Sequence, residues 1–476
     1  MDAPPAPSSR AASTALYVAM TGATVATFFA VRSAGSTLVA PPRPASDVAH
    51  AFGRASAGAG GDALLHVLLA MLAIIAASRA CGWLFRKVNQ PEVIGEVVAG
   101  ILLGPSLLGR VAPDVAAFIL PPTVAPALGV LAQVGVILFM FLVGMELDTS
   151  LVRRNARATA AIAHASIAAP FVLGAAASLW LYPRYSNGDV PFGVFALFLG
   201  VSMSVTAFPV LARILTDRGL QRTPLGVIAL SCAAVGDVTA WCLLALVVGV
   251  ANARLGAAAR TLALAAVYVA VMLGAVRPLV ARTARRQELL GAVPRTTTAA
   301  LLVGLLASAL ATEAIGIHAL FGAFLLGAVV PHDSLLARAM REKLEDVAVV
   351  FLLPAFFAFT GLRTQIGLLH GAGDWLACGG VVAVACVGKF GGTSLAARLT
   401  GLPPRDAASL GVLMNTRGLM ELIVLNVGLD LGVLSPTLFA MMVVMALATT
   451  VATSPALHAL QRSRRPEDIP PGANVV

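Results

Sequence analysis

Charged side chains are scarce in this sequence of 476 residues. Only 12% of the residues are Asp, Glu, Lys or Arg, whereas 58% are hydrophobic, and the mean hydropathy is +0.89. A soluble domain carries about 25% charged residues. The apolar residues come in blocks separated by polar joints, and a helix needs about 20 apolar residues to cross the hydrocarbon core of a membrane. The composition therefore excludes a soluble enzyme and predicts an all-α polytopic membrane protein.

Several chemical signatures are also missing. The chain has no P-loop, no HExxH and no GxSxG motif, and "VGKFGG" (387–392) lacks the glycine spacing and the Ser/Thr of a phosphate-binding loop. The cysteines are odd in number, show no CxxC spacing and lie in or beside apolar segments, so we expect packed thiols: Cys81, Cys232, Cys242, Cys378 and Cys386. No cofactor, metal site or catalytic residue is predicted, and an ion gradient is the expected driving force.

The apolar blocks predict thirteen membrane spans. Residues 1–61 are low in complexity, with one apolar stretch at 13–31 that is either an extra helix or a signal segment. Residues 62–460 form the transmembrane domain, and 461–476 form a short tail. The expected spans are 63–85, 91–109, 124–147, 158–182, 191–215, 223–250, 260–281, 296–314, 317–331, 345–362, 374–397, 405–429 and 434–460.

The net charge of +10 reflects where the basic residues lie. They occupy short joints rather than one patch, which argues against nucleic acid and favours the positive-inside bias of a membrane protein. Alternate joints carry twenty basic residues, and the remaining joints carry five: Arg110, Arg184, Arg254, Arg260 and Arg363. We expect the richer side, with the C-terminus, to face the cytoplasm, and the protein to lie in the cytoplasmic membrane.

One acid interrupts the apolar stretch "ALSCAAVGDVTAWCLLALVVGV" (229–250). An ionisable group at mid-membrane costs about 2.5–3.5 kcal/mol on insertion scales and usually faces a cavity or a partner. Asp237 is therefore either a structural aspartate capped by neighbouring hydroxyls or a carboxylate that holds a proton and a cation in turn.

A lone lysine is the second anomaly. The chain has three lysines against thirty arginines, and Lys389 lies in the apolar stretch "VVAVACVGKFGGTSLAARL". Lysine can lose its proton when it is buried, whereas arginine does not. A structural salt bridge and a titrating role are both consistent with Lys389. Each needs an acid nearby, and Asp237 is the obvious one.

Two spans contain residues that break helices. "SMSVTAFPVLAR" (202–213) places Pro209 in mid-span, and "GVLMNTRGLMELIVLN" (411–426) places Arg417 and Glu421 four residues apart, where they can pair on a helix. These are spans five and twelve, so they cross in opposite directions, which is typical of an inverted repeat with an ion site at the midplane. The expected unwound residues are Ser204, Val205, Thr206, Ala207, Phe208, Pro209, Asn415, Thr416, Arg417 and Gly418.

Five stretches together resemble a known family. They are "NQPEVIGEVVAGILLGPSLLG" (89–109), "GVILFMFLVGMELD" (135–148), "SVTAFPVLARIL" (204–215), "TEAIGIHALFGAFLLGAVVP" (312–331) and "NTRGLMELIVLNVG" (415–428). The chain is similar to the monovalent cation:proton antiporter-2 family of the sodium/hydrogen exchanger superfamily, and within it to plant-type cation/H⁺ exchangers and their bacterial relatives. The resemblance runs from about residue 63 to 460.

The resemblance implies thirteen spans, a dimerisation domain and a core domain with two crossed, unwound helices, and a homodimer. It implies that Asp237 is the ion-binding aspartate and that Lys389 is the basic residue opposite it. The family usually has Asp-Asp or Asn-Asp at this point, whereas this chain has Gly236–Asp237. A single carboxylate favours one-for-one exchange, and water or backbone carbonyls remain alternatives for completing the coordination shell.

These features predict a secondary antiporter that exchanges K⁺ or Na⁺ for H⁺. Asp237 would bind the competing ions, Thr206 and nearby carbonyls would supply further oxygens, and Lys389 would be the counter-charge. Arg417 and Glu421 would form a structural ion pair. The alternatives are a cation channel or leak pathway, and a non-transporting sensor in which Gly236 marks a decayed site.

Overall fold

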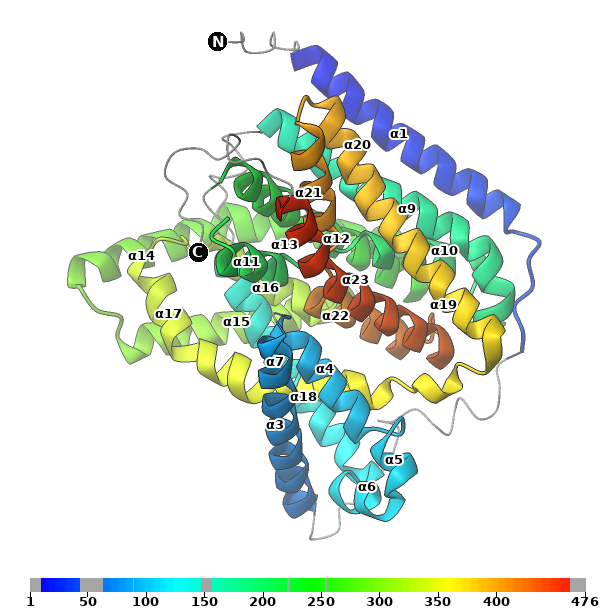
Figure 1. Ribbon diagram of the computed structural model, residues 1–476. Helices are drawn as coiled ribbons and strands as arrows, with labels where there is room; N and C mark the ends of the chain where they lie inside the picture. Colours follow the sequence, from blue (N-terminus) through cyan, green and yellow to red (C-terminus); the bar gives the residue numbers. More distant parts are fainter. Residues whose placement is uncertain are drawn as a thin grey trace.

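The computed structural model describes residues 10–42, 63–88, 90–146, 156–220, 223–252 and 255–462, and it is helical throughout, with no strand in these ranges (Figure 1). Most of the linker before residue 63 and nearly all of the tail expected at 461–476 lie outside the described residues. The apolar stretch near the N-terminus forms α1 (Arg10–Ala34), which runs along the outside of α9 (Ala156–Tyr185).

The helices match the apolar blocks of the sequence. Ten described helices are long and apolar enough to span a membrane, and a bent pair, α21 (Pro404–Met414) with α22 (Leu419–Asp430), makes an eleventh. Shorter apolar helices, α10 (Phe192–Ser204) and α16 (Ala319–Val329), fall in two more of the expected spans. Membrane insertion is thus explained by composition, while the total of thirteen spans stays a prediction.

A first group of helices packs together along the chain and across it. Its members are α3 (Ala63–Lys87), α4 (Glu92–Leu103), α7 (Ala125–Glu146), α15 (Arg295–Ile315), α16 and α18 (Leu353–Arg363). Short helices attached to this group are α5 (Leu108–Val111), α6 (Pro113–Ile119), the 3₁₀ turn Pro122–Val124, α17 (Leu335–Glu345) and the π-helical turn Asp346–Leu352.

A second group contains both interrupted spans. Its members are α9, α10, α11 (Phe208–Asp217), α12 (Pro224–Asn252), α19 (Gly371–Cys386), the π-helical turn Val387–Gly391, α20 (Gly392–Leu399), α21, α22 and α23 (Pro436–Arg462). The two groups are linked by α13 (Leu255–Val271), the π-helical turn Met272–Val276 and α14 (Arg277–Leu290), and also by the 3₁₀ turn Ile366–Leu368.

Glycines set the closest helix contacts inside the first group. A Cβ added to Gly327 on α16 would lie 2.2 Å from the Phe141 carbonyl oxygen of α7, and one added to Gly361 on α18 would lie 2.5 Å from the Gly100 backbone of α4. Helices in a membrane associate through such close backbone approach, because lipid tails leave no hydrophobic driving force between them. The glycines therefore fix the positions of α7, α16, α4 and α18.

Substitution at such a contact is expected to destabilise the fold. Gly327→Ala should lower the apparent melting temperature in detergent, because overpacking costs about 1–3 kcal/mol and exceeds the gain of up to about 1 kcal/mol in helix propensity. Gly379→Ala is the matched control, because a Cβ at that exposed position of α19 meets nothing within 4 Å. Equal melting temperatures for the two variants would contradict the packing argument.

Candidate ion site at the crossing of two interrupted helices

The first interruption separates α10 from α11. Val205, Thr206 and Ala207 are non-helical, with Val205 extended at φ −64° and ψ 140°. The unwound segment is shorter than the predicted range Ser204 to Pro209, because Ser204 ends α10 and Phe208 and Pro209 begin α11. A proline in the first turn of a helix has no backbone N–H to lose, so it starts α11 rather than unwinding it.

The second interruption lies between α21 and α22 at Asn415–Gly418, and the two halves are bent by 43°. The interruptions are hydrogen-bonded to each other. The Ala207 N–H donates to the Thr416 carbonyl at 3.0 Å, and the Thr206 hydroxyl donates to the Met414 carbonyl at 3.4 Å. The two breaks therefore form one crossing, in which each compensates part of the backbone that the other leaves unpaired.

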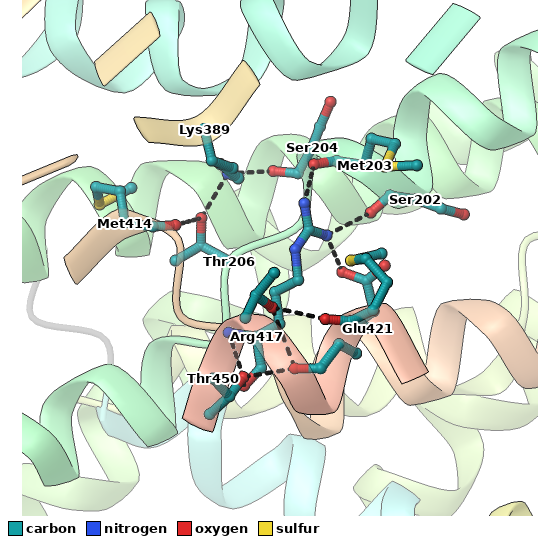
Figure 2. Close-up of polar contacts among 12 residues, drawn as sticks. Ser202, Met203, Ser204, Thr206, Lys389, Met414, Arg417, Glu421 and Thr450 are labelled. Atoms are coloured by element: carbon teal, nitrogen blue, oxygen red, sulfur yellow. Dashed lines mark hydrogen bonds and ion pairs between the residues drawn. The ribbon is translucent and has the colours of Figure 1, made fainter. Parts of the chain in front are cut away.

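Arg417 joins the two spans (Figure 2). Its guanidinium donates to the Ser202 carbonyl at 3.2 Å and to the Met203 carbonyl at 2.8 Å, and it pairs with Glu421. The side chains of Arg417 and Glu421 are fully buried. The ion pair of the sequence analysis is present, but Arg417 lies in the break rather than on a helix. It caps the end of α10, a contact that the sequence analysis missed.

The backbone of Arg417 is held by α23. The Arg417 N–H donates to the Thr450 hydroxyl at 3.0 Å, and this hydroxyl donates to the Arg417 carbonyl at 2.7 Å. One threonine thus satisfies both backbone groups of a residue that has no helical partners. Arg417 is therefore fixed at its backbone as well as at its guanidinium, as expected of a structural element.

Lys389 binds the same end of α10. Its ammonium donates to the Ser204 carbonyl at 2.5 Å and to the Thr206 hydroxyl at 2.6 Å, and the residue is fully buried (Figure 2). It projects from the π-helical turn Val387–Gly391, and such turns inside helices are frequent at functional sites. Lys389 and Arg417 together bind the last three carbonyls of α10, where the helix dipole favours positive charge.

Asp237 lies at the middle of α12, which packs against α10, α11 and α21. It is 2% exposed, and its Oδ1 atom has no hydrogen-bond partner among the described residues. Asp237 and Lys389 interact electrostatically, but no direct ion pair joins them in the described part of the chain. The Lys389 ammonium is instead hydrogen-bonded to Ser204 and Thr206.

The residue before Asp237 has no side chain, and its Cβ position is open. A Cβ added to the buried Gly236 would meet no atom within 4 Å. Other oxygens of the crossing also lack a partner within the described ranges, namely Asn415 Oδ1 and Thr416 Oγ1. The Asn415 amide donates to the Cys386 thiol at 3.5 Å. Buried oxygens normally have a hydrogen-bond donor or a cation, so this set is chemically suited to an alkali ion, which prefers oxygen ligands.

The chain is similar to several known antiporters. The chain is 43% identical over 396 residues to the Na(+)/H(+) antiporter NhaS4 of Synechocystis sp. (strain ATCC 27184 / PCC 6803 / Kazusa). The alignment covers 83% of this chain and 97% of that protein. Cation/H(+) antiporter 20 of Arabidopsis thaliana is 41% identical over 82% of this chain and 48% of its own length. K(+)/H(+) antiporter 1 of Saccharomyces cerevisiae is 35% identical over 78% of this chain and 43% of its own length.

This chain thus spans about half the length of the plant and yeast relatives. Among solved structures, the sodium proton antiporter MjNhaP1 of Methanocaldococcus jannaschii has a similar fold, with a TM-score of 0.54 at 15% identity over 84% of this chain and 99% of that one. The family model described as the transmembrane region of the sodium/hydrogen exchanger matches residues 69–460. The chain belongs to the sodium/hydrogen exchanger family.

Proposed function

We propose that this protein is a secondary antiporter that exchanges K⁺ or Na⁺ for H⁺. The observation that carries the proposal is Asp237, a buried carboxylate with a free oxygen beside the crossing of two interrupted helices. A buried carboxylate in a membrane is stable when it is protonated or when a cation neutralises it. Family membership and the names of the three relatives described above, each an antiporter, support the same function.

One carboxylate couples the two ions by competition. Asp237 binds either one proton or one cation, and the cation completes its shell with Thr206 and carbonyl oxygens of the crossing. In this structure the Lys389 ammonium is hydrogen-bonded to the Thr206 hydroxyl and the Ser204 carbonyl. A cation that uses the Thr206 oxygen therefore displaces the ammonium, whose charge compensates Asp237 when no cation is bound. Gly236 adds no second carboxylate, which supports the exchange of one proton for one cation.

We place the protein in the cytoplasmic membrane as a homodimer with its C-terminus in the cytoplasm. The bias of basic residues among the joints supports this orientation, because basic residues are retained on the cytoplasmic side. The rim of the molecule that carries Arg363 is then the outer rim.

Two other functions make different predictions. A channel conducts without countertransport, shows unitary currents and does not require Asp237 to exchange ions. A sensor with a decayed site folds but gives no cation-dependent proton flux. The open space at Gly236 and the free oxygen of Asp237 favour a working site.

Asp237→Asn should abolish exchange, because an amide neither releases a proton nor neutralises a cation. The measurement is cation-dependent dissipation of a pH gradient in everted vesicles or proteoliposomes. Asp114→Asn is the control, because Asp114 is an exposed acid on α6. An Asp237→Asn protein that exchanges like the wild type would show that the single-carboxylate site is wrong.

Thr206→Val should raise the cation concentration for half-maximal exchange about tenfold, because one oxygen ligand worth about 1.4 kcal/mol is lost. Thr206→Ser keeps the hydroxyl, so its cation concentration for half-maximal exchange should stay close to that of the wild type. Running K⁺, Na⁺, Rb⁺ and Li⁺ in parallel also gives the selectivity. If valine and serine behave alike, the Thr206 hydroxyl does not bind the cation.

Gly236→Asp should convert electroneutral exchange into electrogenic exchange, since it adds a second proton-binding carboxylate next to Asp237 in the chain, at a position where a Cβ meets no obstacle. Currents evoked by cation jumps on solid-supported membranes report net charge movement. The wild type and Gly236→Asn should give none, and Gly236→Asp should give a sustained current. A wild-type current of the same size would refute one-for-one exchange.

A further inference from the structure

The two groups of helices are separated by a cavity on the side of Arg363. It has a volume of about 660 Å³ and is lined by α7, α16 and α18 of the first group and by α22 and α23 of the second. The lining includes Gln133, Phe356 and Ile423, the last of which lies two residues beyond Glu421 on α22. The cavity therefore reaches from the rim towards the crossing.

On the side of α4, the helices pack closely against the crossing. Val93, Ile94 and Val97 of α4 face Gly418 and Leu422 across a gap of about 10 Å³. This space is at the lower limit for a single water molecule. The space around the crossing is thus unequal, with a cavity of about 660 Å³ on the side of Arg363 and room for about one water molecule against α4. Such an asymmetry fits one end state of an alternating-access cycle.

A polar bridge crosses the boundary between the groups beside the open cavity. Arg363, the last residue of α18, donates to Asn426 Oδ1 at 3.1 Å and to Asp430 Oδ1 at 2.5 Å on α22. The Asn426 amide donates in turn to the Thr360 hydroxyl at 2.8 Å. We call these four residues, Thr360, Arg363, Asn426 and Asp430, the Arg363 bridge.

The bridge attaches the ion-site helix to the other group. Asn426 and Asp430 lie one turn apart on α22, and Thr360 and Arg363 lie one turn apart on α18, so each pair shares a helix face. The same α22 begins at Leu419, two residues after Arg417, and carries Glu421. A movement of α22 relative to α18 by one helical turn would therefore break every bond of the bridge.

The bridge has the properties of a contact that can be broken. The Arg363 side chain is 9% exposed, but that of Asp430 is 55% exposed, so water can replace the ion pair. Asn426 and Arg363 both line the cavity, where released groups can be hydrated. A permanent structural pair, such as Arg417 with Glu421, is fully buried instead.

We propose that the Arg363 bridge is a latch that holds the two groups of helices in the present state and has to open in every exchange cycle. This inference rests on the proposed function, since it assigns α22 a movement that exchange requires. Arg363 is in this view a positioning residue that sets the balance between the two end states. The rival interpretation is a hinge, in which α18 and α22 stay together throughout the cycle.

A reversible cross-link separates latch from hinge. Thr360→Cys and Asn426→Cys are combined in a protein whose five native cysteines are replaced by alanine, and the pair is joined with a short bis-methanethiosulfonate reagent. A latch predicts at least about a tenfold loss of exchange on cross-linking and its recovery on reduction. Each single-cysteine protein is the control. Undiminished exchange by the cross-linked protein would overturn the proposal.

A second measurement does not depend on transport. Ile94→Cys is introduced with the native cysteines retained, and modification of residue 94 by a water-soluble maleimide is quantified by mass spectrometry. Adding Arg363→Gln should speed modification about tenfold, because the weakened latch populates the state in which α4 and α22 separate. With Arg363→Lys, the rate of modification should lie between that of the Ile94→Cys protein and that of the Arg363→Gln variant. Arg184→Gln is the control, since Arg184 bonds within α9.

The two measurements also separate this inference from the proposed function. Faster modification of residue 94 together with absent ion flux would support the latch and refute the antiport. Normal flux with unchanged modification of residue 94 in Arg363→Gln would refute the latch and retain the antiport.

Discussion

The structure depends on how the open end of α10 is stabilised inside the membrane. A helix that stops at mid-membrane leaves carbonyl oxygens without donors, and each unpaired group costs several kcal/mol in hydrocarbon. Two buried cations from other spans, Arg417 and Lys389, bind the last three carbonyls of α10. Without these cations the break would not be stable, and the crossing that forms the candidate site would not exist. Glu421 and Asp237 then balance the two positive charges.

The two cations differ in how firmly they are held and in whether they can lose a proton. Arg417 is held by the fork of its guanidinium, by Glu421 and by Thr450 at its backbone, and an arginine does not lose its proton in a protein. Lys389 has a flexible stem and two contacts, and a buried lysine can lose its proton. The fixed cation therefore maintains the fold of the crossing, whereas the second one can leave its oxygens to a transported ion. This division follows from the chemistry of the side chains.

Much of this arrangement could be predicted from the sequence. The length of the apolar blocks predicted the membrane-spanning helices. Asp237, Lys389 and the pair Arg417–Glu421 stood out because charged groups are costly in lipid. The partners could not be predicted, because they come from different spans. Lys389 was expected to meet Asp237, the obvious acid, but carbonyl groups carry no signature in a sequence and these hold the ammonium. The Arg363 bridge was missed for the same reason, since Arg363 and Asp430 are 67 residues apart.

Thr206 shows how the two interrupted spans are coupled. Its hydroxyl accepts a hydrogen bond from Lys389 and donates one to the Met414 carbonyl, the last of α21. A hydroxyl has one donor and two acceptor positions, so it can serve both helix ends at once. When the ammonium leaves, the oxygen of Thr206 is free to accept a cation while its proton still binds α21. Exchange at this position therefore alters the α10 end and keeps the link to α21, so the two broken spans can move as one unit with α22.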